Sequence, residues 1–250
     1  MKAYIIKIEL LDTNPPIWRR VIMPADATFN RLHDVIQAVT NFQSGYPHDG
    51  YHLFRFDLPE DNLAVTNDEE AYLERQHYKK NKALYAKRLK KASPAHLKFE
   101  QFHQDQLKIE IRKPTGLKID KYLEAHKEIH YLYDFGSDWR FTITLENTVD
   151  DYYFGYPTLL DGAEAAPPED VGGIDGFYEF LSIYRDETHP EHEEMNQWGQ
   201  SQRFREYDPD RTNSFLKCLH YKKTEWGKIN HDNHRIIEDK YRKEQDGLNS

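Results

Sequence analysis

The N-terminal part of the chain alternates apolar and polar residues in the way that predicts β-strands. Apolar side chains recur at every second position over residues 3–11, and 17–23 forms a second such run. The connector 12–16 is rich in turn-forming residues, so we expect the two strands to pair antiparallel. Apolar residues then recur at helical spacing behind Thr28, which can cap a helix, and 51–58 alternates again. The predicted order is β-β-α-β.

The rest of the chain predicts a central hairpin followed by helices. Residues 129–135 and 140–146 are strand candidates, and Gly136-Ser137-Asp138 between them suits a tight turn. A shorter strand is expected over 107–112. Helical spacing follows in three segments, 174–185, 191–199 and 213–226. Two stretches without a regular period are predicted to be loops, 59–71 and 156–173. We therefore expect an α+β fold, with an antiparallel or mixed β-sheet packed against helices and a helical C-terminal part.

Two blocks of opposite charge lie among these elements. Residues 72–92 hold eight Lys or Arg and one acidic residue, Glu74, which predicts a basic helix that Ser93-Pro94 ends. From 146 to 195 there are fourteen Asp or Glu and one Lys or Arg, Arg185. The predicted organisation is a single α+β domain over 1–250, an inserted basic helical segment over 67–104 and a frayed tail over 246–250.

Composition narrows the class of protein. The 250 residues carry 34 Lys and Arg against 43 Asp and Glu, a formal charge of −9, which argues against a surface that grips nucleic acid throughout. The 17 Tyr, 13 Phe and 4 Trp supply enough apolar area for a core, so a disordered chain is excluded. No apolar run approaches the roughly 20 residues of a membrane helix. The lone cysteine, Cys218, allows no internal disulfide, and we predict a cytoplasmic protein without a membrane partner.

Several motifs together indicate a family. The chain resembles the plasmid Ri open-reading-frame-three-like family, whose genes occur on plasmids, in transposons and on bacterial and archaeal chromosomes. Five motifs in the same order support the resemblance: Pro16-Ile-Trp-Arg-Arg-Val21, Leu32-His33, Tyr133-Asp-Phe-Gly-Ser-Asp-Trp139, Pro167-Pro-Glu-Asp-Val-Gly-Gly173 and His189-Pro-Glu-His-Glu-Glu194. The resemblance extends over about 3–58 and 115–215. It implies an α+β fold with a mixed or antiparallel sheet under helices, and it implies no particular activity.

The chain departs from the family pattern at two positions. Phe141 stands where members commonly have His, and Ala166 stands where they commonly have Cys. If these side chains form a metal or catalytic pair in relatives, that pair is absent from this chain.

The loop around the paired prolines is the first candidate site. Glu169, Asp170 and Asp175 can hold a divalent cation or act in acid–base chemistry. The structural alternative is that Asp170 caps a turn while the glycines supply positive φ angles. Side chains that can converge on this loop from other elements are Arg19, Arg20, His33, His52 and Arg140. Asp138 is predicted to bond backbone amides in the hairpin turn.

A second candidate is the pair His189 and His192, whose spacing can supply ligands to a metal ion. The structural alternative is a helix start, with Pro190 at the first position and glutamates in the first turn. The sequence favours the helix start. We predict no cofactor, with a divalent metal as the open alternative.

The basic helix is the third candidate, as a surface for a protein or nucleic-acid partner. Its cationic residues are Arg75, Lys79, Lys80, Lys82, Lys87, Arg88, Lys90 and Lys91. Tyr78 and Tyr85 can add stacking, or the helix can pack on the acidic region 146–195 of the same chain or of a second subunit. The sequence therefore favours a binding or accessory protein with a macromolecular partner. The alternative is a metal-dependent hydrolase or nuclease that uses the loop 167–175, and whether the protein is an enzyme stays open.

Overall fold

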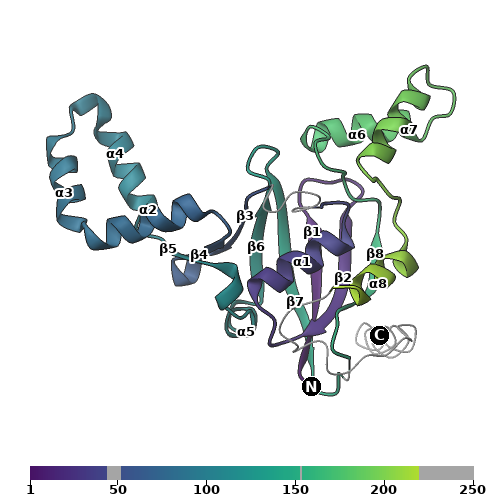
Figure 1. Ribbon diagram of the computed structural model, residues 1–250, viewed down its shortest axis with the longest axis horizontal. Helices are drawn as coiled ribbons and strands as arrows, with labels where there is room; N and C mark the ends of the chain where they lie inside the picture. The colour runs from purple at the N-terminus through teal and green to yellow at the C-terminus, as the bar shows by residue number, and fades with distance from the viewer. Residues whose placement is uncertain (44–51, 153, 220–250) are drawn as a thin grey trace.

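The computed structural model describes residues 1–43, 52–152 and 154–219, which form one eight-stranded sheet with helices over one face and at both ends (Figure 1). The strands are β1 (Ala3–Leu10), β2 (Ile17–Pro24), β3 (Phe54–Leu58), β4 (Leu63–Thr66), β5 (Glu110–Arg112), β6 (Glu128–Tyr133), β7 (Trp139–Val149) and β8 (Thr158–Ala163). The α-helices are α1 (Phe29–Val39), α2 (Glu69–Lys80), α3 (Lys82–Lys91), α4 (Pro94–Gln106), α5 (Asp120–His126), α6 (Gly173–Tyr184), α7 (His192–Ser201) and α8 (Pro209–Lys217).

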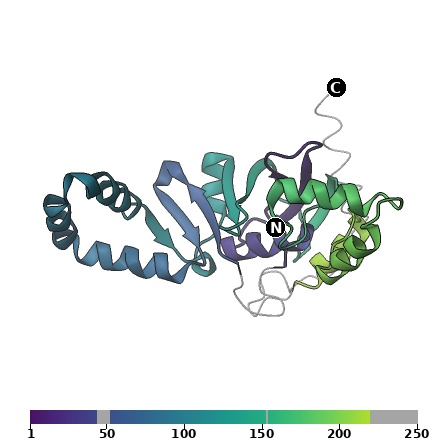
Figure 2. The same ribbon diagram turned by 90° about the horizontal axis from the view of Figure 1, so that it is seen from above.

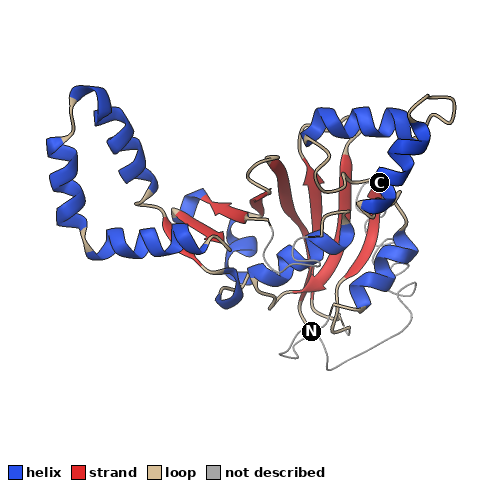
Figure 3. Ribbon diagram, turned by 45° about the horizontal axis from the view of Figure 1, so that its top comes forward, coloured by secondary structure: helices blue, strands red, loops and turns tan. Residues whose placement is uncertain are grey.

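The strand order is β5-β4-β3-β6-β7-β1-β2-β8. Neighbouring strands pair antiparallel except β4 and β5, which pair parallel. The sheet is therefore mixed, and the predicted α+β class is confirmed (Figure 3). The predicted pairing of the first two strands is also confirmed, with Ala3 opposite Pro24 and Leu10 opposite Ile17.

The main core lies between α1 and one face of the sheet. Thr28 caps α1 by accepting a hydrogen bond from the Arg31 N–H, and the apolar stripe of the helix is buried against alternate residues of β1, such as Ile6 and Ile8. Burying each such aliphatic side chain contributes about 1.5–3 kcal/mol. The opposite face has a smaller core around Tyr152 and Leu160. The period of two in β1 and the helical period in α1 thus bring the same core together.

The structure has four elements that the sequence prediction did not define. Within 59–71 lies β4, and within 156–173 lies β8, so both predicted loops contain a strand. A separate helix, α4, follows the stop expected at Ser93-Pro94 within the predicted helical segment 67–104, and α5 was not predicted. Neither strand alternates apolar and polar residues, because β4 is buried at all four positions and β8 has Asp161 and Gly162 after three buried residues, so no period of two emerges from the sequence. The expected helix 213–226 begins earlier, because Asp208 caps α8 by accepting from the Arg211 N–H. Beyond Leu219 that prediction and the tail 246–250 lie outside the described residues.

The predicted basic helix is two helices, α2 and α3, broken at Asn81. The Asn81 backbone N–H and side-chain amide both donate to the carbonyl of His77, which ends α2, and Asn81 has a non-helical φ of −123°. We call α2, α3 and α4 together the helical arm, residues 69–106. The arm connects the parallel strands β4 and β5 and projects away from the sheet (Figure 2).

The helical arm and the acidic helices stand at opposite ends of the molecule. The arm leaves the sheet at β5, whereas α6 and α7 lie at the β8 end (Figure 1). Packing of the basic helix on the acidic region of its own chain, one of the predicted options, is therefore wrong. In the part of the chain that the structure describes, no helix combines the length and apolar character that crossing a bilayer requires.

Candidate functional site

The loop between β8 and α6 has a backbone that few residues adopt readily. Its left-handed positions include Asp170, at φ 56°, and the two glycines at the start of α6, Gly172 at 87° and Gly173 at 78°. The glycines adopt positive φ at little cost because they lack a Cβ atom. Pro167 and Pro168 are buried, which fixes the loop against the rest of the protein.

Arg19 binds the start of this loop. Its side chain, only 3% exposed, donates to the carbonyls of Ala163 at 2.7 Å and Glu164 at 2.8 Å. It also donates to Val39 O, at 2.9 Å, and its guanidinium lies 4.4 Å from the centroid of the Tyr207 ring. Burial lowers the pKa of Arg19 to about 10. Arg19 therefore joins β2, the end of α1 and the loop through carbonyl groups rather than through a carboxylate.

Glu169 extends from the loop into a polar cluster. Its Oε1 accepts from the Tyr133 hydroxyl at 2.7 Å and from the Gln43 N–H at 2.7 Å. Its Oε2 is buried, has no hydrogen-bond partner among the described residues, and lies 3.6 Å from Nε2 of His52. Burial raises the pKa of Glu169, against the opposing effect of the Tyr133 hydrogen bond.

His52 lies between two carboxylates, Asp134 and Glu169, whose pKa values are shifted in opposite directions. Its Nδ1 lies 3.5 Å from Oδ1 of Asp134, and its Nε2 faces Glu169. Burial alone would raise the pKa of Asp134, but hydrogen bonds from Ser137 and the Gly136 N–H lower it. The imidazole therefore lies within ion-pair distance of two carboxylates whose pKa values are shifted in opposite directions.

The structure brings only some of the predicted site residues together. Glu169 and His52 meet, but Asp138 pairs with Arg140 across two residues, and that pair faces solvent. Asp170 and Asp175 are exposed and make no ion pair within the described part of the chain. Arg20 pairs with Glu146 instead of the loop.

The two predicted histidine ligands are bonded locally. His192 Nδ1 lies 3.1 Å from the carbonyl of Ile183, and His189 Nδ1 accepts from the Glu191 N–H at 3.2 Å. Pro190 lies two residues before α7 rather than at its first position. Across residues 1–43, 52–152 and 154–219, no group of three His, Cys, Asp or Glu side chains is arranged to hold a metal ion.

Tyr133 and Gln43 are the members of the Glu169 cluster that sequence reasoning missed. Tyr133 ends a strand with apolar alternation, which predicts a core residue, and its side chain is indeed buried. Its hydroxyl bonds Glu169, and its ring packs edge to face against His52 with centroids 5.6 Å apart. The only sequence signal was its position next to Asp134 in the hairpin motif.

The loop also requires glycine at position 176, in the first turn of α6. A Cβ atom there would stand 2.0 Å from the carbonyl oxygen of Val171. Gly176→Ala is therefore expected to lower the free energy of unfolding by about 1–3 kcal/mol, measured by urea denaturation. Gly116→Ala is the matched control, because nothing lies within 4 Å of its added Cβ. Equal stability of the two variants would show that the loop does not press against α6.

The helical arm presents a second candidate surface. It holds five of the nine most exposed large hydrophobic side chains of the described residues: Leu73, Leu84, Leu97, Phe99 and Phe102. Phe99 and Phe102 are 67% and 65% exposed. Within α3, five Lys or Arg occur without an acidic residue. The surface thus combines apolar and cationic side chains.

The expected stacking by Tyr78 and Tyr85 is wrong. They are 9% and 5% exposed and pack with Leu107, the residue that follows the arm, in a small core. Their rings are 5.0 Å apart, so they hold α2 against α3 and are not available to a ligand.

Comparison with known proteins gives a sequence relative, a solved structure with a similar fold and a matching family model. The chain is 28% identical over 193 residues to the uncharacterized protein y4hQ of Sinorhizobium fredii, covering 77% of this chain and 78% of that protein. The crystal structure of the protein of unknown function MM3350 from Methanosarcina mazei Go1 matches with a TM-score of 0.56 at 27% identity, over 84% of this chain and 96% of that one. The family model for the plasmid pRiA4b ORF-3-like protein matches residues 2–214. Because that match spans most of the chain, the protein belongs to the plasmid pRiA4b ORF-3-like family.

Proposed function

We propose that this protein is a cytoplasmic binding or accessory protein that contacts a protein partner through the helical arm. The observation behind the proposal is the arm's combination of exposed Leu and Phe side chains with lysines, such as Lys87, Lys90 and Lys91, that form no ion pair within the described residues. Phe99 and Phe102 are neighbours on one face of α4 at i, i+3 spacing, and adjoining exposed apolar side chains of this kind mark interaction sites. An arm that projects from the sheet can reach such a partner without disturbing the main core (Figure 2).

The apolar residues favour a protein partner over nucleic acid. Lysines can neutralise phosphates and phenylalanines can stack on bases, but Leu73, Leu84 and Leu97 have no role in either contact. The tyrosines that would have extended a stacking surface are buried. A protein surface with both acidic and apolar side chains complements all of these groups.

The metal-dependent hydrolase is the weaker alternative. It needs Glu169, Asp170 and Asp175 as ligands, but Glu169 already accepts two hydrogen bonds and the other two carboxylates face solvent. Asp134, His52 and Glu169 form a polar cluster, but only one carboxylate of the predicted metal-binding loop, Glu169, belongs to it. We therefore assign the function to the arm.

Photo-crosslinking tests this proposal directly. With p-benzoylphenylalanine at position 102, we expect a covalent protein adduct in cells of the host. The adduct should disappear when Lys87→Glu, Lys90→Glu and Lys91→Glu are added, because the charge complementarity is reversed. Position 135 gives the matched control, since Phe135 is also exposed, at 42%, but lies on the β6–β7 hairpin. Absence of any protein adduct specific to position 102, or an adduct removed by nuclease, would contradict the proposal.

A further inference from the structure

We propose that the partner is a second copy of this chain, and that α3 of one molecule docks into the groove between α6 and α7 of the other. This inference rests on the proposed function, because it names the protein that the arm binds. It follows from the chemistry of two surfaces at opposite ends of the same molecule.

The groove between α6 and α7 has an apolar floor and an acidic rim. Its volume is about 420 Å³. The floor includes Phe180, Met195 and Trp198, and the rings of Phe180 and Trp198 meet edge to face with centroids 5.3 Å apart. The rim consists of exposed carboxylates, including Glu179, Glu191 and Glu194. These three carboxylates have no ion-pair partner among the residues described, so the groove is ready for a cationic and apolar occupant.

The outer face of α3 has the complementary character. Tyr85 faces the small core of the arm, so the residues on the opposite side of the helix face outward. They are Leu84, Lys87, Lys90 and Lys91, all exposed. None of these three lysines forms an ion pair within the described part of the chain. One leucine among three lysines matches an apolar floor among three glutamates, and an ammonium group over Trp198 would add a cation–π contact.

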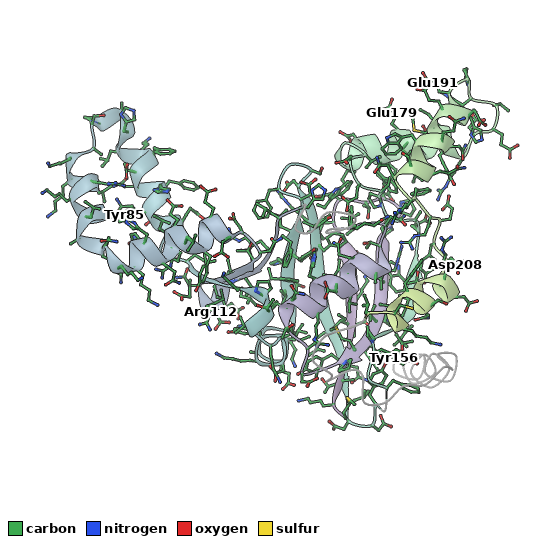
Figure 4. All side chains as sticks on the ribbon, in the orientation of Figure 1. Tyr85, Arg112, Tyr156, Glu179, Glu191 and Asp208 are labelled. Atoms are coloured by element: carbon green, nitrogen blue, oxygen red, sulfur yellow. The ribbon has the colours of Figure 1, made fainter. Side chains whose placement is uncertain are left out.

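The shape of the molecule permits both contacts to form at once. In Figure 1 the arm rises at one end of the sheet and α6 and α7 rise at the other, with Glu179 and Glu191 labelled there in Figure 4. Rotation by 180° about an axis perpendicular to that view brings the arm of one copy to the α6–α7 pair of the other, and the reverse. The same two surfaces are then used twice, which is the closed arrangement of a twofold dimer.

Light scattering coupled to gel filtration tests this dimer. We expect the wild-type chain to elute at twice its 29.8 kDa mass at low ionic strength and to dissociate as salt screens the charges. The arm variant Lys87→Glu/Lys90→Glu/Lys91→Glu and the groove variant Glu179→Lys/Glu191→Lys/Glu194→Lys should each elute as monomers. All six positions are exposed, so circular dichroism should show both variants folded.

Mixing the two variants provides the decisive measurement. In a mixed dimer the acidic arm of one variant meets the basic groove of the other, and the remaining arm and groove keep their original charges. The mixture should therefore recover the dimer mass that each variant lacks alone. A mixture that stays monomeric overturns the inference, and so does an arm variant that remains a dimer.

The two proposals fail in distinguishable ways. If the wild-type chain is a monomer but position 102 still crosslinks to a different protein, the second-copy inference falls and the proposed function stands. If position 102 forms no adduct and the chain is a monomer, both fall. A dimer whose position-102 adduct has twice the chain mass supports both.

Discussion

Arg19→Met is expected to lower the free energy of unfolding by about 3 kcal/mol or more. Arg19 is 3% exposed and donates to carbonyls in β2, at the end of α1 and at both residues that start the loop after β8. Removing the guanidinium takes one donor from each of those oxygens, and a buried acceptor left unpaired costs about 1–3 kcal/mol. The free energy lost with these hydrogen bonds is larger than the free energy gained because methionine carries no charge that burial must desolvate. Urea denaturation followed by circular dichroism measures it.

The neighbouring residue supplies the control. Arg20→Met removes an ion pair with Glu146 on the other face of the same strand, where the Arg20 side chain is 25% exposed. Such pairs contribute about 0–1 kcal/mol. The loss of stability in Arg19→Lys should lie between the losses in Arg19→Met and Arg20→Met. One ammonium group cannot reach all the carbonyls that the planar guanidinium reaches. If Arg19→Met were no worse than Arg20→Met, Arg19 would not hold the loop in place.

Acid should destabilise the protein through His33, with a loss of about 4 kcal/mol by pH 3.5 from this residue alone. Burial lowers the pKa of His33 to about 3 in the folded state, from 6.5. Below pH 6.5 the unfolded chain therefore binds a proton that the folded chain cannot accept until about pH 3. Stability is lost as the pH falls through this window, at about 1.4 kcal/mol per pH unit.

The double variant His33→Phe/Tyr131→Phe isolates this contribution. His33 Nδ1 lies 2.8 Å from the Tyr131 hydroxyl, and the imidazole stacks on Phe54 at 3.8 Å, so both polar groups are replaced together by rings that fit the stack. The expected result is a shallower dependence of unfolding free energy on pH between 6 and 3.5, measured by urea titration at each pH. Carboxylates such as Asp134 act equally in both proteins. Parallel pH curves would show that His33 is not the acid-sensitive group.

The sequence predicted those elements whose own residues form a regular pattern. β1 and α1 have eight and eleven residues and each contributes a regularly spaced apolar face to the main core, so the period is visible without the partner that covers it. β4 and β8 lack such alternation, and their pairing with β3 and β2 determines them more than their own composition does. The break at Asn81 arises where the asparagine side chain bonds the carbonyl of His77. The spacing of apolar residues gives no information about that hydrogen bond.

The candidate site was predictable only in part for a related reason. A carboxylate in a proline- and glycine-rich loop is a candidate site residue from sequence alone, so Glu169 was predicted. Its distances to His52 and Tyr133 depend on how segments that are remote in sequence pack together. Exposed apolar residues of the arm were not predicted either, because a leucine in a helix is ordinarily assigned to a core, and only the structure shows that the arm has a core of three buried residues.

That three-residue core has a consequence for the dynamics of the arm. Tyr78, Tyr85 and Leu107 are its buried apolar contacts, and Arg75 bonds the arm's base to Ile109 O at 2.7 Å and to Glu110 at 2.9 Å. So few contacts make a cooperative unit that opens at a free energy below that of global unfolding. Amide protons of α3 should thus exchange with solvent while those of β1 and β7 remain protected. The arm can unfold and refold as an independent unit on a sheet that stays intact.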